Sequence, residues 1–190
     1  MLGKNSTTDP KKLIERAKAG DSEAFETLYL LYLAPLYRYV YFRVLSKEEA
    51  EDLVQSVFLK VYRSLPNYRQ QGKEPLAFFY TVARNAIIDY QRKKRELLGD
   101  TGDVIEQIAD EESEVFTALI PDRYQQGAIR EALLQLSDDQ REVVLMKFMQ
   151  DMDYAEIASA MDKSEVAVRQ IQSRALKALR SILAKYNDGE

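Results

Sequence analysis

The sequence predicts an all-α protein built from two small helical domains. Apolar residues recur at spacings of three and four along most of the 190 residues, and few segments alternate as strands do. Seven Gly and five Pro leave room for long uninterrupted helices. The periodicity weakens only where breakers and acids gather, at residues 96–127. We therefore expect helical domains at residues 10–95 and 128–185, joined by a flexible acidic linker.

Capping signals predict the first two helices. Asp9 is a preferred N-cap residue and Pro10 suits the first helical position, so a helix should start there and close at Gly20. A second helix should start at Ser22 and continue through "EAFETLYLLYLAPLYRYVYFRVL". Within it, Pro35 should kink or restart the helix, because proline cannot donate the intrahelical hydrogen bond.

The third and fourth helices complete the first predicted domain. Glu49 follows Ser46 by three residues, which predicts a capping box. The helix that it opens has one apolar face, made of Leu53, Val54, Val57, Phe58, Val61 and Leu65. "PNYRQQGKEP", residues 66–75, predicts a loop. The helix at 76–95 should bury Phe78 or Phe79, Val82, Ala86, Ile87 and Tyr90, and it ends in a basic run.

Charge is sorted along the chain, although the net charge is only −4. Residues 60–95 contain nine Lys or Arg against two acids, a net +7. Residues 96–127 contain nine acids against one Arg, a net −8, and residues 163–185 have a net +5. The acidic average therefore hides two basic surfaces that could face nucleic acid.

The second predicted domain contains a helix-turn-helix. Ser137 with Gln140 and Asp153 with Glu156 predict caps for two helices. "DKSE" at 162–165 makes a turn in which Ser164 caps the last helix. The inner faces of the two helices should be Ala155, Ile157, Ala158 and Met161, and then Val168, Ile171, Ala175, Leu176 and Leu179. The outward face should be Arg169, Gln170, Gln172, Ser173, Arg174 and Lys177.

Both basic surfaces suggest nucleic-acid binding. The polar face of the last helix carries amide and guanidinium groups that read base edges and phosphates, although an ordinary helical hairpin is the alternative. The helix at 76–95 combines aromatics with positive charge, which suits single-stranded nucleic acid. Core packing is the alternative for its aromatics, and we expect it for Phe79 and Tyr80. Tyr68 lies in the loop and has less reason to be buried.

Composition excludes several classes of function. The chain has no Cys and no His, which removes thiol catalysis, histidine triads and Cys/His zinc sites. The carboxylates at 110–112 lie in a breaker-rich segment, so we expect no enzyme, cofactor or metal. The first residues lack an apolar signal core, and no apolar run reaches ~18 residues. We expect a cytoplasmic protein without direct membrane insertion.

These segments resemble, in order and spacing, a bacterial RNA polymerase sigma factor of the extracytoplasmic-function (ECF) group of the sigma-70 family. "KEEAEDLVQSVFLKVYRSLPNY" resembles the polymerase-binding helix of region 2, and "PLAFFYTVARNAIIDYQRKKR" the promoter-melting helix. "LSDDQREVVLMKFMQDMDYAEIASAMDKSEVAVRQIQSRALKALRSIL" resembles region 4. The resemblance covers roughly residues 12–95 and 128–184.

The resemblance implies the partners and the site residues. Both large subunits of core RNA polymerase, promoter DNA and an anti-sigma factor would be partners. Polymerase contacts would be Asp52, Leu53, Val54 and Gln55. The −10 element would be opened and held by Asn67, Tyr68, Arg69, Arg84, Asn85, Arg92 and Lys93. The −35 duplex would be bound by Ser164, Arg169, Gln170, Ser173, Arg174 and Lys177. The acidic linker would run through the polymerase toward the RNA exit path.

Three residues depart from the family pattern. Phe78 stands where the family usually has Trp, and Ile171 where many members carry a basic residue. Asp162 stands where the turn usually has Gly, so it must take any left-handed conformation itself.

The second interpretation is a helix-turn-helix regulator of the response-regulator output type, with a sensor or dimerisation domain in the first ~95 residues. No phospho-acceptor pocket on alternating strands is visible in support of it.

Overall fold

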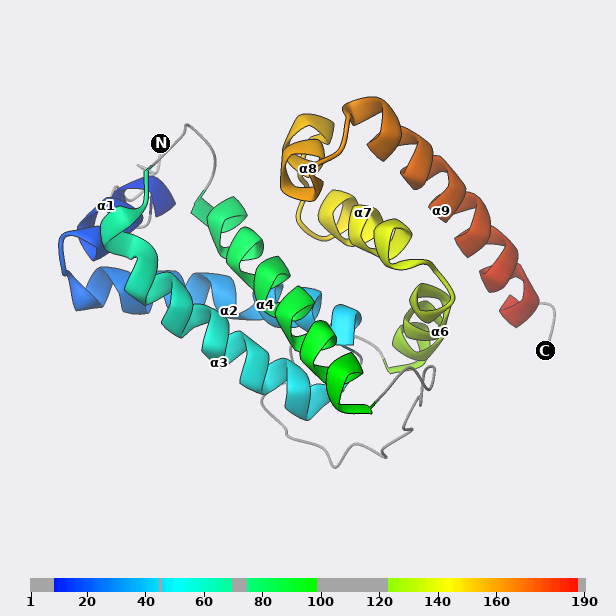
Figure 1. Ribbon diagram of the computed structural model, residues 1–190, viewed down its shortest axis with the longest axis horizontal. Helices are drawn as coiled ribbons and strands as arrows, with labels where there is room; N and C mark the ends of the chain where they lie inside the picture. The colour runs from blue at the N-terminus through cyan, green and yellow to red at the C-terminus, as the bar shows by residue number, and fades with distance from the viewer. Residues whose placement is uncertain (1–8, 45, 70–74, 99–122, 188–190) are drawn as a thin grey trace, which may run out of the picture. The chain divides into compact units, whose positions relative to one another are not determined.

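The computed structural model describes residues 9–44, 46–69, 75–98 and 123–187. Within these ranges the regular structure is entirely helical (Figure 1), which confirms the predicted fold class. The elements are α1 (Pro10–Lys18), α2 (Ser22–Val44), α3 (Lys47–Ser64), the 3-10 turn η1 (Leu65–Asn67), α4 (Pro75–Leu98), α6 (Arg123–Leu134), α7 (Asp138–Phe148), α8 (Tyr154–Met161) and α9 (Glu165–Asn187).

The chain divides into two compact units. The first consists of residues 1–40 and 46–109, and the second of residues 41–45 and 110–190. Helix α4 continues to Leu98 and α6 begins at Arg123, so both ends of the predicted linker are helical. Residues 99–122 lie outside the described residues. The linker and the domain bounds therefore stay predictions.

The core of the first unit is an aromatic layer shared by α2, α3 and α4. Tyr32 of α2 meets Phe79 of α4 edge to face, with ring centroids 4.9 Å apart. Tyr29 of α2 lies 4.5 Å from Phe58 of α3, and Phe58 also contacts Phe79. Such tilted pairs add about 0.5–1.5 kcal/mol each beyond area burial. Phe79 and Tyr80 are buried, as predicted.

Helix α2 is one continuous element although it contains Pro35. Of the two predicted outcomes, a kink or a restart, the restart is therefore wrong. Proline inside a helix costs about 3 kcal/mol through the lost hydrogen bond and a steric clash. The residues that follow it are nevertheless buried against the core, among them Leu36, Tyr37 and Tyr39. Burial of such side chains is worth about 1.5–3 kcal/mol each, which offsets the local penalty.

The predicted caps of α1 and α3 differ in their outcome. Asp9 Oδ1 accepts a hydrogen bond from Lys11 N at 3.0 Å, and Pro10 is the first helical residue, as predicted. Ser46 Oγ accepts from Glu49 N at 3.4 Å, which is one half of the predicted capping box. The Glu49 side chain, however, accepts a hydrogen bond from Lys94 Nζ at 2.9 Å. A contact between α3 and α4 therefore uses the carboxylate that the sequence assigned to the cap.

The second unit packs α7, α8 and α9 around one apolar cluster. Its members are Val143, Met146, Met152, Ile157, Ala158, Met161 and Val168. Both bonds of each predicted capping box are present, at Ser137 with Gln140 and at Asp153 with Glu156. Two predicted inner residues are wrong, because Ala155 is exposed and Leu176 is 40% exposed.

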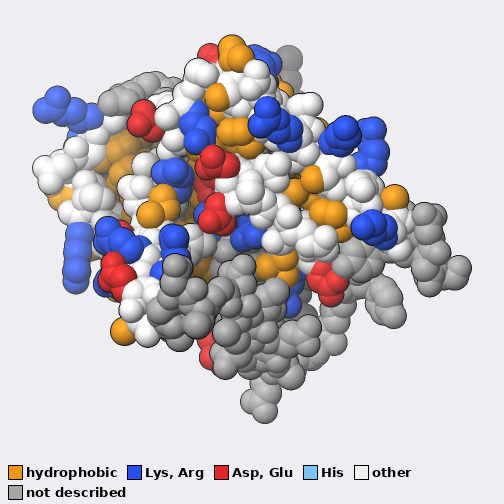
Figure 2. All heavy atoms as spheres, turned by 45° about the vertical axis from the view of Figure 1, so that its right-hand side comes forward, with side chains coloured by type: hydrophobic (Ala, Val, Ile, Leu, Met, Phe, Trp, Pro, Cys, Tyr) orange, Lys and Arg blue, Asp and Glu red, His pale blue; other side chains and the backbone are white. Residues whose placement is uncertain are grey.

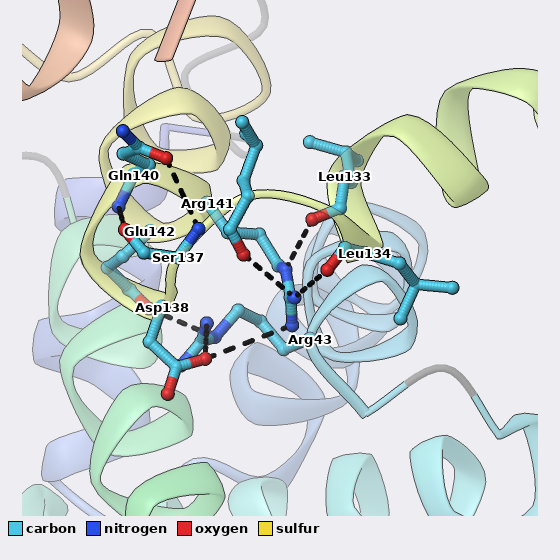
Figure 3. A network of polar contacts seen from close by, with 9 residues as sticks. Arg43, Leu133, Leu134, Ser137, Asp138, Gln140, Arg141 and Glu142 are labelled. Carbon is cyan, nitrogen blue, oxygen red and sulfur yellow. Dashed lines mark hydrogen bonds and ion pairs between the residues drawn. The ribbon is translucent and has the colours of Figure 1, made fainter. Parts of the chain in front are cut away.

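The buried side chain of Arg141 joins α7 to the end of α6 (Figure 3). Its guanidinium donates to three backbone carbonyl oxygens: to Leu133 O at 2.8 Å, to Leu134 O at 3.1 Å and to Leu136 O at 3.3 Å. The last carbonyls of a helix have no intrahelical partner. Arg141 therefore satisfies carbonyls at the C-terminus of α6 and in the turn that follows, and it links both to α7.

Candidate polymerase and nucleic-acid interfaces

Helix α3 presents two of the four residues of the predicted polymerase-binding motif to solvent. Asp52 and Gln55 are exposed, three residues apart on one side of the helix. Val54 is only 2% exposed and belongs to the core, and Leu53 is half-buried. The polar members of the motif are thus available to a partner, while Val54 supports the helix that carries them.

The same face of α3 continues into two exposed apolar side chains. Leu59 and Tyr62 are 58% and 53% exposed. Leu59 follows Gln55 by four residues, and Tyr62 follows Leu59 by three. Exposed apolar residues grouped with polar ones are typical of an interaction surface. Sequence reasoning missed this pair because it placed only the buried stripe on the helix. The signal was present in the spacing of residues 52, 55, 59 and 62.

The loop that carries the predicted −10 residues Asn67, Tyr68 and Arg69 is anchored to the rest of the first unit through Tyr68. The Tyr68 ring packs on Phe78, with centroids 4.5 Å apart, and Tyr68 O accepts a hydrogen bond from Lys18 Nζ at 2.8 Å. Tyr68 is therefore half-buried, whereas its neighbours Asn67 and Arg69 are exposed. The next residues of the loop, 70–74, lie outside the described residues.

Helix α4 spreads its predicted strand-contacting residues around its circumference. At ~100° per residue, Asn85 and Arg92 fall within about 20° of each other. Arg84 and Lys93 fall roughly 80–100° to either side of them. Arg84 is half-buried, while the other three are exposed. Arg92 also lies 3.1 Å from Asp89, an exposed ion pair of little energetic weight. Asn85 and Arg92 form the most compact of these surfaces.

One cation of the basic run belongs to the packing of the first unit. Lys94 Nζ lies 2.9 Å from Glu49 Oε1 and 5.7 Å from the centroid of the Tyr90 ring. The hydrogen bond to Glu49 raises the pKa of Lys94. Burial raises the pKa of Tyr90 to about 12, and the Glu49 carboxylate acts in the same direction. Lys94 is thus already paired, in contrast to the exposed Lys93.

The turn between α8 and α9 has the geometry of a helix-turn-helix. Asp162 caps α8 with φ 53° and ψ 49°, the left-handed conformation predicted for it. Lys163 N donates to Ala158 O at 3.0 Å, which closes the end of α8. Ser164 Oγ then accepts from Ala167 N at 3.2 Å and caps α9. The predicted DNA residue Ser164 therefore has a structural role at the helix start.

Helix α9 gathers the remaining predicted −35 residues on one exposed face. Arg169, Gln170, Ser173, Arg174 and Lys177 are all exposed. At ~100° per residue they fall within an arc of about 140°. Val168 and Ala175 lie on the opposite, buried side. Gln172, predicted to point outward, is half-buried and accepts a hydrogen bond from Tyr154 Oη at 2.7 Å.

Val166 is a further candidate for contact with the DNA duplex that was not predicted from the sequence. It is 65% exposed and lies three, four and seven residues before Arg169, Gln170 and Ser173, in the middle of the same face. Apolar side chains contact the methyl group of thymine in the major groove. Figure 2 shows hydrophobic side chains at the surface among lysine and arginine side chains on the face that it presents.

The regular structure of the described residues is helical, and the second unit contains a helix-turn-helix, an element typical of DNA-binding proteins. Comparison with models of known protein families identifies the family more specifically. Residues 28–96 match "Sigma-70 region 2" and residues 126–179 match "Sigma-70, region 4". The chain belongs to the ECF group of sigma-70 family RNA polymerase sigma factors, as the relatives described next also show.

Two relatives illustrate the match in sequence. The ECF sigma factor BldN of Streptomyces coelicolor is 35% identical over 173 residues, which are 90% of this chain and 65% of BldN. This chain thus spans slightly less than two thirds of the length of BldN. The ECF sigma factor SigX of Bacillus subtilis is 33% identical over 171 residues, 83% of this chain and 82% of SigX.

Solved structures are similar in fold. RpoE of Bartonella quintana, solved with the anti-sigma factor NepR, has a TM-score of 0.72 at 24% identity. That likeness covers 84% of this chain and 96% of RpoE. CnrH, solved with the cytosolic domain of CnrY, has a TM-score of 0.68 at 18% identity and covers 94% and 98% of the two chains.

The alternative of a response-regulator output protein is not favoured. Its first ~95 residues would be a sensor or dimerisation domain, whereas residues 28–96 match sigma-70 region 2. The described residues contain no group of three or more acidic side chains that could hold a metal ion. The same part of the chain contains no helix long and apolar enough to cross a membrane.

Proposed function

We propose that this protein binds core RNA polymerase and directs it to specific promoters, where it binds the −35 duplex and opens the −10 element. The observation that supports this proposal most is that one chain matches both sigma-70 regions, region 2 at residues 28–96 and region 4 at residues 126–179. We propose that it acts without catalytic activity of its own, in the cytoplasm, where the polymerase is.

The first unit supplies the surfaces for polymerase and for the opened strand. The outward face of α3 would bind the polymerase through Asp52 and Gln55, with Leu59 and Tyr62 adding apolar area. On α4, the strand-contacting surface would be centred on Asn85 and Arg92 and flanked by Lys93 and Arg84. Asn67 and Arg69 would flank a base that stacks near Tyr68, since aromatic faces hold single-stranded bases at about 1–3 kcal/mol each.

The second unit supplies the duplex-binding surface. The exposed face of α9 would enter the major groove with Arg169 at one edge and Arg174 at the other. A bidentate arginine–guanine contact is worth about 1–3 kcal/mol of discrimination. Gln170, Ser173 and Lys177 lie between these arginines on the same face.

Two parts of the proposal rest on sequence and relatives. The acidic residues of the segment 96–127 would follow the positively charged path of the polymerase toward the RNA exit, on the argument of charge alone. An anti-sigma factor would hold the protein inactive, as the complex of RpoE with NepR suggests by analogy.

Run-off transcription with purified core RNA polymerase tests the proposal. Genomic fragments are transcribed with core enzyme alone, with core enzyme plus this protein, and with core enzyme plus the Asp52→Arg variant. We expect discrete transcripts only with the wild-type protein. Specific DNA binding by the protein alone, with no effect on the start sites that the polymerase uses, would instead support the regulator alternative.

A further inference from the structure

Tyr154, the first residue of α8, contacts two polar side chains of the recognition helix α9. The carbon at the centre of the Arg169 guanidinium lies 3.8 Å from the centroid of the Tyr154 ring. The Tyr154 hydroxyl donates to Gln172 Oε1 at 2.7 Å. Neither contact was expected from the sequence, because 15 and 18 residues separate the partners. One aromatic side chain thus touches one residue assigned to base contact and one at the edge of that face.

The stacking contact restrains Arg169 without using its hydrogen-bond donors. A guanidinium that lies on an aromatic face is held through the face of its plane, and its five N–H groups point outward along the edges. These edges are what a guanine O6/N7 pair or a phosphate requires. The competing ion pair with Glu165 measures 3.6 Å between two side chains that are half exposed, so it restrains Arg169 weakly.

The Tyr154 side chain is itself restrained by its neighbours in the second unit. Tyr154 is the first residue of α8 and follows the N-cap residue Asp153 directly. Both hydrogen bonds of the capping box between Asp153 and Glu156 are present, at 2.7 and 2.9 Å. The ring packs on the apolar cluster of the second unit. Lys147 Nζ lies 5.2 Å from the ring centroid while it donates to Met152 O at 2.9 Å. Arg169 therefore rests on an aromatic ring that is held by a packed helix start.

A restrained arginine loses less conformational entropy when it binds DNA. Arginine has several rotatable bonds, and ordering one such side chain on binding weakens affinity by a few-fold to about tenfold. Gln172 is three residues beyond Arg169, on the same side of α9, and its bond to the hydroxyl orients its amide as well. We propose that Tyr154 is a positioning residue, which holds Arg169 and Gln172 in the orientation that reads the upstream promoter element. The proposal rests on the function proposed above and deepens it.

Two other roles for Tyr154 give different results. As a core residue only, it would support the fold, and its loss would weaken all DNA sequences together with thermal stability. As a phosphate contact through its hydroxyl, its loss would weaken all sequences alike, and a phosphate contact by a neutral donor leaves the salt dependence nearly unchanged. A positioning residue instead changes discrimination at the particular base pair that the positioned side chain reads.

The test uses the full chain bound to core RNA polymerase. A duplex library with a randomised upstream element is passed over the wild-type holoenzyme, and the selected sequence becomes the probe. Affinities are then measured for this probe and for its single base-pair changes with Tyr154→Leu, Arg169→Ala and the double variant. We expect Tyr154→Leu to weaken the probe about fivefold and to relax the same base pair as Arg169→Ala. The double variant should be weaker than Arg169→Ala by clearly less than the fivefold that Tyr154→Leu causes alone, because only the contribution through Gln172 is then left to lose.

A matched cycle and a milder variant complete the experiment. Gln170→Ala removes an exposed neighbour of Arg169 for which no contact with Tyr154 is expected. In the double variant Tyr154→Leu/Gln170→Ala, the two fold-losses of affinity should therefore multiply. Tyr154→Phe keeps the ring and should relax only the position that Gln172→Ala relaxes. If Tyr154→Leu melts below the assay temperature, the cycle of Tyr154→Phe with Gln172→Ala decides by the same rule.

Multiplicative losses in the Tyr154–Arg169 cycle would overturn the proposal, and so would an equal loss on every base-pair variant of the probe. A wild-type holoenzyme that selects no sequence from the library would overturn the proposed function, and this inference with it. A wild-type holoenzyme that selects a sequence, together with multiplicative losses, would overturn the inference alone.

Discussion

Replacing Arg141 with methionine should loosen the second unit by about 3 kcal/mol. Arg141 is 8% exposed and donates to three backbone carbonyls at 2.8, 3.1 and 3.3 Å. A hydrogen bond to a charged group contributes about 1.5–3 kcal/mol, and the longest of the three contributes least. Methionine replaces the apolar stem and removes the buried charge, whose desolvation is unfavourable. We therefore expect a net loss well below the sum of the three bonds.

Hydrogen exchange on the full chain measures this effect unit by unit. A loss of ~3 kcal/mol corresponds to opening that is roughly 100-fold more frequent. Amides of α7 (Asp138–Phe148) should exchange faster by this factor, while amides of α4 serve as an internal reference in the first unit. Arg180→Met is the matched control, because Arg180 is an exposed arginine on α9 and its substitution should change stability by less than about 0.5 kcal/mol.

A change of less than about threefold in the exchange of α7 in Arg141→Met would refute this stabilising role of Arg141. The same change in Arg180→Met would refute it equally, because the effect would then follow from the loss of any arginine. Either result would mean that the carbonyls at the end of α6 find other partners, such as water, at little free-energy cost.

Four further predictions concern other features of the molecule. Asp52→Arg and Gln55→Ala should weaken the affinity for core polymerase in pull-down titrations and leave the circular-dichroism spectrum unchanged, because both side chains are exposed. Asp162→Val should destabilise the second unit by about 1–2 kcal/mol in thermal melts, and Asp162→Gly should not, because φ is 53° at this residue. Raising the pH from about 10 to 12 should destabilise the first unit, because folding raises the pKa of Tyr90 to about 12 from an ordinary 10. The stability that the neutral phenol contributes is then lost across this range. Hydrogen exchange of α4 amides should report this destabilisation, and the destabilisation should be smaller in Tyr90→Phe. Deleting residues 100–114 should strengthen low-salt DNA binding by the isolated protein in fluorescence anisotropy and impair initiation by the holoenzyme, because the acidic segment competes with phosphates for the basic surfaces.

Each of these predictions has an outcome that contradicts it. Unchanged polymerase affinity in both α3 variants would remove the polymerase contact from this face. Equal melting of the Gly and Val variants at residue 162 would mean that the turn relaxes to another conformation. Identical alkaline behaviour of Tyr90→Phe and wild type would assign the loss to other groups. Equal DNA affinity with and without residues 100–114 would leave the acidic segment as a tether only.

Local sequence patterns predicted most of the helix boundaries and the helix-turn-helix. The N-caps Asp9, Ser137, Asp153 and Ser164 act on backbone N–H groups two or three residues away, so their effect can be derived from the sequence alone. The left-handed Asp162 was expected from the family resemblance, because the turn usually has Gly there and Asp tolerates the conformation better than most residues. The composition excluded Cys and His chemistry outright.

Only the tertiary structure decided which polar side chains remain available to a partner. Glu49 binds Lys94 rather than its own helix start, Gln172 binds Tyr154, and Arg141 is buried at the end of α6. These contacts join residues 5 to 45 positions apart, and their partners depend on how the helices pack. Helical periodicity places a side chain on a face, but it carries no information on what the neighbouring helix presents there. For the same reason the sequence could indicate a basic recognition helix, while the aromatic ring on which Arg169 rests was visible only in the packed second unit.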